Sequence, residues 1–228
     1  MGHPSATSIS GTPRVATGVL VVALQLAAPL AWPRPPEPLS SYTCGEIDRA
    51  LSKSHDAFTA QFDSPSIQYP ARDALKTLRQ DCAKAPVPLG EVRKEIETRI
   101  RESLASDPSR FTVAVVSYSW CAACADAFTR YKAIATHDPD VRFVMLEGDA
   151  YDGVPDPSQA DYAFNRFLSR LFDLTVPPGY PGYVVMDKNG AVLRGTPENP
   201  VAQSFYGEQG FKLAMKSIEH ARKSRPRP

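Results

Sequence analysis

The chain has 228 residues, which at about 150 residues per domain allows one full domain and a smaller appendage. Its 26 lysine and arginine residues balance 25 aspartate and glutamate residues, and the net charge of +1 argues against a large nucleic-acid surface. The four histidines form no H-E-x-x-H pair, which argues against a histidine-based metal enzyme. The four cysteines are too few for a small protein built on disulfides.

The amino end is first polar and then strongly apolar, as in an export signal. Residues 1–14 carry one basic residue, Arg14, and residues 15–32 carry no charge. This pattern fits a cleaved secretory signal or an uncleaved membrane anchor better than a buried helix. Because the first two alternatives export everything after residue 32, we expect an extracytoplasmic protein that is periplasmic or secreted. If residues 15–32 are not removed, they form a membrane tether.

Composition and periodicity divide the chain into five segments. We expect a signal peptide or membrane anchor (1–32), a Pro-rich linker (33–40), a helical extension (41–105), an α/β domain (106–223) and a basic tail (224–228).

The extension shows three apolar stripes with helical spacing, separated by prolines. The stripes are Ile47, Leu51, Phe58 and Phe62; Leu75, Leu78 and Cys82; and Val92, Ile96, Ile100 and Leu104. Cys44 begins the first expected helix and Cys82 ends the second, so an antiparallel hairpin would bring them together. We predict a structural disulfide between them, and two alternatives remain, namely thiols that are free or buried, or a second redox centre.

In the α/β domain, patterns typical of strands and of helices alternate along the sequence. We expect strands at 111–118 and 141–147, helices at 121–135, 160–172 and 208–223, and a hairpin at 183–194. Asn189-Gly190 marks the hairpin turn. The order β-α-β-α-β-β-α predicts a mixed sheet, because the βαβ half implies parallel strands and the hairpin adds antiparallel ones.

The chemistry is concentrated in the segment Trp120-Cys121-Ala-Ala-Cys124. Two cysteines three residues apart at a helix start lie on one face, close enough for a disulfide. We expect Cys121 to be the exposed sulfur, with its thiolate stabilised by the helix N-terminus, and Cys124 to be the more buried resolving thiol. Cys121 would attack a substrate disulfide, and Cys124 would release the mixed disulfide.

Three other interpretations of this C-x-x-C remain open. A zinc half-site needs a second pair, which the spacing of Cys44 and Cys82 does not supply. Haem attachment needs a histidine after the second cysteine, where Ala125 stands. The third alternative is a purely structural disulfide. The position of the motif between a buried strand and a helix favours redox activity.

Together these residues resemble the thioredoxin superfamily over about residues 108–223. The matching pieces are the strand 111–118, the motif of Cys121 and Cys124, and the segment 179–190 with Pro181. The resemblance implies a thioredoxin-like fold, a central mixed sheet flanked by helices, which here follows a small disulfide-linked α-helical region.

The resemblance also implies roles for residues around the cysteines. It places a cis-proline at Pro181, packed against the redox disulfide, and lets the backbone beside it pair with an extended substrate segment. Trp120 and Tyr180 would then border the substrate site.

Several positions depart from the family pattern. The buried acid expected six residues before the first cysteine is replaced by Val115, and the usual Gly-Pro between the cysteines is Ala122-Ala123. Gly182 follows Pro181 where the family often has threonine. Glu147 is a candidate substitute acid, although an exposed acid at a strand end is the simpler expectation.

We therefore expect a thiol–disulfide oxidoreductase for protein thiols and disulfides, with reductase favoured over oxidase and with no cofactor, metal or nucleic acid. A reductase outside the cytoplasm needs a partner in electron transfer, which we expect to be a membrane electron donor or acceptor. The alternative is a non-catalytic thioredoxin-fold scaffold or a metal-handling protein.

Overall fold

The structure is a computed structural model, and it describes residues 39–53, 66–153, 163–175, 179–193 and 205–224. The predicted signal or anchor, most of the Pro-rich linker, the second half of the first expected helix with Phe58 and Phe62, and the last four residues of the basic tail lie outside the described residues.

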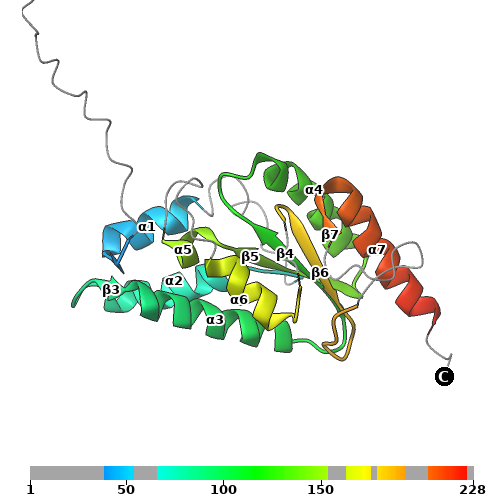
Figure 1. Ribbon diagram of the computed structural model, residues 1–228, viewed down its shortest axis with the longest axis horizontal. Helices are drawn as coiled ribbons and strands as arrows, with labels where there is room; N and C mark the ends of the chain where they lie inside the picture. The colour runs from blue at the N-terminus through cyan, green and yellow to red at the C-terminus, as the bar shows by residue number, and fades with distance from the viewer. Residues whose placement is uncertain (1–38, 54–65, 154–162, 176–178, 194–204, 225–228) are drawn as a thin grey trace, which may run out of the picture. The chain divides into compact units, whose positions relative to one another are not determined.

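A five-stranded mixed sheet forms the centre of the fold (Figure 1). Its strands, in spatial order, are β2 (Ile67–Gln68), β5 (Val141–Glu147), β4 (Phe111–Ser117), β6 (Gly182–Met186) and β7 (Phe205–Tyr206). The first three strands are parallel to one another, β6 runs antiparallel to β4, and β7 runs antiparallel to β6. A separate two-stranded ladder pairs β1 (Ser41–Tyr42) with β3 (Val87–Pro88). The predicted strands at 111–118 and 141–147 are confirmed.

Helices cover both faces of the sheet (Figure 1). They are α1 (Cys44–Lys53), α2 (Pro70–Asp81), α3 (Leu89–Ala105), α4 (Ala122–His137), α5 (Asp149–Asp152), α6 (Ala163–Leu171) and α7 (Gly207–Lys223). The three helices predicted after residue 120 are confirmed as α4, α6 and α7 with shifts of a few residues at their ends. The fold class is therefore confirmed as a mixed sheet flanked by helices.

All seven residues of strand β4 are buried, which explains why its sequence is almost entirely apolar. Its side chains alternate between two hydrophobic clusters. Ala114 and Val116 join the first cluster, with residues of α2, α3 and α6. Val113 and Val115 join the second cluster, with residues of α4 and α7.

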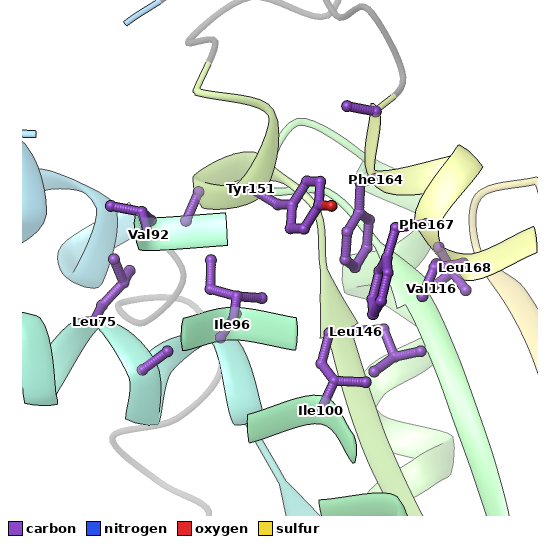
Figure 2. Packing of buried hydrophobic residues seen from close by; sticks show 14 of the residues in the cluster. Leu75, Val92, Ile96, Ile100, Val116, Leu146, Tyr151, Phe164, Phe167 and Leu168 are labelled. Carbon is purple, nitrogen blue, oxygen red and sulfur yellow. The ribbon is translucent and has the colours of Figure 1, made fainter. Parts of the chain in front are cut away.

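The helical extension and the α/β domain share one core, so the predicted boundary between residues 105 and 106 is not a boundary in packing. Figure 2 shows Ile96 and Ile100 of α3 in the same cluster as Val116, Leu146 and Phe167. The extension also supplies β2, which pairs with β5 at the edge of the sheet. The sequence did not predict this strand because two residues are too few to show an alternating pattern.

The predicted hairpin at 183–194 is formed only in part. Gly190 has a positive φ of 80°, as the expected turn requires, and the Asp187 carboxylate accepts hydrogen bonds from two backbone N–H groups of that turn. Its second arm, however, is reduced to one bridge between Met186 and Val192. The strand that pairs with β6 on this edge is β7, which the sequence analysis did not predict.

Candidate redox site

The link between β4 and α4 places Cys121 at the N-cap of the helix. The Cys121 N–H donates to the Tyr118 carbonyl oxygen at 3.0 Å, and the residue itself is extended with φ −84° and ψ 93°. Its sulfur accepts a hydrogen bond from the Cys124 N–H at 3.1 Å. A helix N-terminus with N–H groups directed at the sulfur stabilises negative charge there, which is what a reactive thiolate needs.

Cys121 and Cys124 form a disulfide with a Cα–Cα distance of 5.2 Å. Our expectation that Cys121 is clearly more exposed is wrong for this oxidised form, because both residues are 8% exposed. The Cys121 sulfur folds back over the first helical turn toward the Cys124 N–H, which brings both residues to a similar depth. The two cysteines therefore differ in position along the helix and not in burial.

Three aromatic rings form a cluster beside the motif. Trp120 and Tyr180, both predicted site residues, have ring centroids 5.6 Å apart. Tyr118 lies against both, at 5.0 Å from Trp120 and 4.6 Å from Tyr180. Trp120 is 39% exposed and is the exposed large hydrophobic side chain of the described residues, so the cluster offers an apolar surface next to Cys121. The sequence analysis missed Tyr118, which continues the buried strand without a change in pattern.

Pro181 stands at the start of β6, next to the end of β4. The Tyr180–Pro181 peptide bond is cis, and Gly182 pairs with Val116 of β4. The Pro181 carbonyl oxygen already accepts a hydrogen bond from the Gly207 N–H at 3.0 Å. The sheet thus brings the segment of Tyr180 and Pro181 to the end of the strand that leads to Cys121.

The chain has a thioredoxin-like fold. The mixed sheet with helices on both faces and the disulfide at the start of α4 carry this assignment.

Comparisons with known proteins agree with that fold, but the assignment does not rest on them. No family model and no curated protein matches the chain. Similar solved structures include a thioredoxin from Nicotiana alata, with 15% identity, a TM-score of 0.36, and coverage of 54% of this chain and 85% of that one. A thioredoxin from Fasciola hepatica has 17% identity, a TM-score of 0.36, and coverage of 54% and 93%. A disulphide isomerase from Xylella fastidiosa Temecula1 has 20% identity, a TM-score of 0.32, and coverage of 57% and 81%.

Glu147 is not the exposed strand-end acid of the simpler expectation. It pairs with Ser117 in the β4–β5 ladder, and strand alternation places it on the α4 face of the thioredoxin-like sheet, where α4 begins. The residue as a whole is only half-buried, but its Oε2 atom is enclosed and has no hydrogen-bond partner among the described residues. Burial raises the pKa of Glu147 to about 8, helped by the Asp149 charge and opposed by Arg72.

The second predicted disulfide joins Cys44 and Cys82. It links the first residue of α1 to the residue after α2, with a Cα–Cα distance of 5.3 Å. Cys82 is 6% exposed, and its sulfur accepts a hydrogen bond from the Arg79 guanidinium at 3.5 Å. This disulfide belongs to the extension, and it lies in the packing of α1 against α2.

The described residues contain no group of three or more histidine, cysteine, aspartate or glutamate side chains arranged to hold a metal ion. None of the helices in the same part of the chain is long and apolar enough to cross a membrane.

Proposed function

We propose that the protein is a thiol–disulfide oxidoreductase that acts on protein disulfides, with Cys121 as the nucleophile and Cys124 as the resolving thiol. One observation supports this most strongly. The Cys121–Cys124 disulfide lies at the N-terminus of α4, where the Cys121 sulfur already accepts a backbone hydrogen bond, beside the exposed ring of Trp120. A helix N-terminus of this kind favours the thiolate that starts the exchange.

In the proposed cycle the reduced protein transfers two electrons to its substrate. The Cys121 thiolate attacks one sulfur of a substrate disulfide and forms a mixed disulfide, and the displaced substrate thiolate takes up a proton. The Cys124 thiol then loses its proton and attacks the Cys121 sulfur. The Cys121–Cys124 disulfide forms, and the second substrate sulfur leaves as a thiolate. The reverse sequence oxidises a substrate dithiol.

We favour the reductase direction because no cation stands between the two cysteines and a carboxylate binds the segment that precedes them. Ala122 and Ala123 place no cation between the cysteines, and Asp149 contacts the residue two positions before Cys121. A nearby carboxylate disfavours the thiolate, so the reduced form gains less stability than in a strong oxidant.

The substrate would lie as an extended segment across the aromatic surface. Trp120 and Tyr180 would contact its side chains next to the reacting cysteine, and the backbone around Pro181 would pair with it. The Pro181 carbonyl is already bonded to Gly207, so this pairing would use the neighbouring backbone groups.

We further propose that this chemistry takes place outside the cytoplasm. The uncharged residues 15–32 after Arg14 support export, either with cleavage or with retention as a membrane tether. An exported reductase needs an external supply of electrons, and a membrane dithiol donor would provide it.

A trapping experiment tests the proposed roles of the two cysteines. Cys124→Ser should accumulate a disulfide-linked adduct with insulin, a protein that contains disulfides, because the mixed disulfide on Cys121 is no longer resolved. Cys121→Ser should form none. If Cys124→Ser forms no adduct, or if both variants form equal amounts, the proposed roles are wrong and a scaffold role takes their place.

A further inference from the structure

We propose that α5 is the positioning element of the redox site, in which Asp149 and Asp152 hold the segment that precedes Cys121 and the helical extension holds α5. The proposal rests on the proposed function, because it assigns these residues to the surface that meets the substrate. It gives the extension a role in substrate recognition that the sequence left open.

Asp149 binds the link between β4 and α4 with both carboxylate oxygens. The Ser119 N–H donates to Oδ2 at 2.7 Å, and the Ser119 hydroxyl donates to Oδ1 at 2.8 Å. Ser119 lies between Tyr118 and Trp120 and two residues before Cys121. A two-point bond to a carboxylate fixes both the position and the rotation of this residue. Asp149 therefore limits where Trp120 and the Cys121 N-cap can lie.

Asp152 fixes the ring on which the other two aromatic rings pack. The Tyr118 hydroxyl donates to Asp152 Oδ2 at 2.6 Å, and Asp152 Oδ1 accepts from the Phe164 N–H at 2.9 Å. Both side chains are buried, at 3% exposure for Tyr118 and 2% for Asp152. A buried carboxylate that has two short hydrogen bonds is costly to displace, so the Tyr118 ring has one well-defined position.

Gly148 shows how closely the Tyr118 ring lies against the start of α5. A Cβ atom at Gly148 would overlap Cζ of Tyr118, so any side chain at this position would have to displace the ring. The Gly148 N–H donates to the Ser117 carbonyl oxygen at 3.0 Å. The end of β4 and the start of α5 are therefore joined by backbone as well as by the two aspartates.

The extension holds α5 from β1 and α3. The Tyr42 hydroxyl of β1 donates to the Ala150 carbonyl oxygen at 2.9 Å. On α3, Arg93 Nε donates to the Tyr151 carbonyl oxygen at 2.8 Å, and Glu97 accepts from the Tyr151 hydroxyl at 2.6 Å. Because these groups bind the backbone and a side chain of α5, a continuous series of contacts connects the extension to Ser119 and Tyr118. Tyr151 also packs in the shared core, as Figure 2 shows.

The expected effect depends on the size of the substrate. To be reduced, a protein disulfide must bind the aromatic surface while one of its sulfurs lies at the Cys121 N-cap. A small aromatic disulfide requires only that the Cys121 sulfur be accessible. Loss of the Asp149 contacts should therefore weaken turnover of insulin and spare the reaction with 5,5′-dithiobis(2-nitrobenzoate). A general loss of folding would reduce both reactions.

The test compares Asp149→Ala with Asp187→Ala in the full chain. Dithiothreitol is the electron donor for insulin turnover, whereas the small disulfide is mixed with pre-reduced protein from which dithiothreitol has been removed, because dithiothreitol would reduce it directly. Asp187 is a matched control, because its carboxylate also accepts two backbone N–H groups in a turn but lies after β6. We expect Asp149→Ala to raise the KM for insulin about tenfold and to change the rate with the small disulfide less than about twofold. Asp149→Asn keeps an acceptor for the Ser119 N–H and should recover part of the loss. Tyr42→Phe should show the same pattern with a smaller effect.

A second measurement does not depend on activity. In a Trp32→Phe background Trp120 is the only tryptophan, and Asp149→Ala should shift its fluorescence emission while Asp187→Ala does not. Equal losses with both substrates, or unchanged KM and unchanged emission, would overturn the positioning role. If the wild-type protein reduces neither disulfide, the proposed function fails, and the emission shift then decides the positioning role by itself.

Discussion

The two disulfides of this chain have almost the same span but very different surroundings. The Cα atoms are 5.3 Å apart in the Cys44–Cys82 pair and 5.2 Å apart in the Cys121–Cys124 pair. The first pair closes a separation of 38 residues between two helices, whereas the second closes only three residues at a helix N-terminus. Closing a long loop restricts the unfolded chain, and closing a short one hardly does. The comparison predicts that the first disulfide stabilises the fold and that the second performs the chemistry.

The largest expected effect is on activity. Cys121→Ser should reduce insulin turnover by at least about a thousandfold, because no thiolate remains at the N-cap of α4 to start the exchange. The thermal midpoint should change little, since only a three-residue loop is opened. Turnover and thermal unfolding of the same preparation check this. Residual turnover near the wild-type level would show that another sulfur is the nucleophile.

The double variant Cys44→Ala, Cys82→Ala tests the other half of the comparison. We expect the free energy of unfolding to fall by about 2–4 kcal/mol, because the 38-residue separation is no longer constrained. Insulin turnover by the folded variant should stay within about twofold of wild type. Denaturant unfolding and steady-state kinetics measure the two effects. A stable variant that has lost turnover would identify this pair as a second redox centre.

The sequence predicted best the elements that bury long apolar segments. Strands β4 and β5 and helix α7 are long enough to show their period, and the motif of Cys121 and Cys124 is visible in any sequence with this spacing. The cis peptide bond at Pro181 was expected only through the family resemblance. Strands β2 and β7 have two residues each, so no pattern could indicate them.

The site was harder to predict where polar residues act through tertiary contacts. Asp149 and Asp152 lie in a segment to which the sequence analysis assigned no helix or strand, and their bonds to Ser119 and Tyr118 span about 30 positions. Likewise, nothing in the sequence shows that the Glu147 carboxyl is enclosed. Such contacts depend on how elements meet in space, which local periodicity does not encode.

A pH effect on stability should appear at Glu147, beside the redox site. Glu147 has a pKa raised from 4.5 to about 8, so between these values the folded protein keeps a proton that the unfolded chain has lost. Stability from this group is therefore complete below about pH 4.5 and declines as the pH rises toward 8. The linkage between pH 5 and pH 8 corresponds to about 4 kcal/mol at most, and solvent around this half-buried side chain lowers it. Because Glu147→Gln cannot ionise, its free energy of unfolding relative to wild type should rise by about 2 kcal/mol over this range.

Denaturant unfolding at several pH values measures this change. Glu91→Gln on α3 is the control, because Glu91 is an exposed acid of the extension. A parallel pH dependence for wild type and Glu147→Gln would show that the carboxyl is solvated.

The smallest expected effect concerns an ion pair beside the structural disulfide. Arg79 Nε and Asp48 Oδ1 are 2.6 Å apart, but the two side chains are 43% and 52% exposed. Solvent screening limits the stabilisation that such an exposed pair provides. Asp48→Asn should therefore lower the free energy of unfolding by about 0.5 kcal/mol or less. Chemical denaturation measures it. A loss above about 2 kcal/mol would mean that this pair, and not the disulfide, holds α1 against α2.

One measurement tests the central comparison most directly. The protein is equilibrated in glutathione buffers of increasing reducing power, its thiols are alkylated, and mass spectrometry counts the label at each cysteine. We predict that Cys121 and Cys124 become labelled together while Cys44 and Cys82 stay oxidised, with a midpoint nearer to about −270 mV than to about −120 mV. If Cys121 and Cys124 never exchange, or if both pairs are reduced at the same potential, the division between a structural and a redox disulfide is wrong.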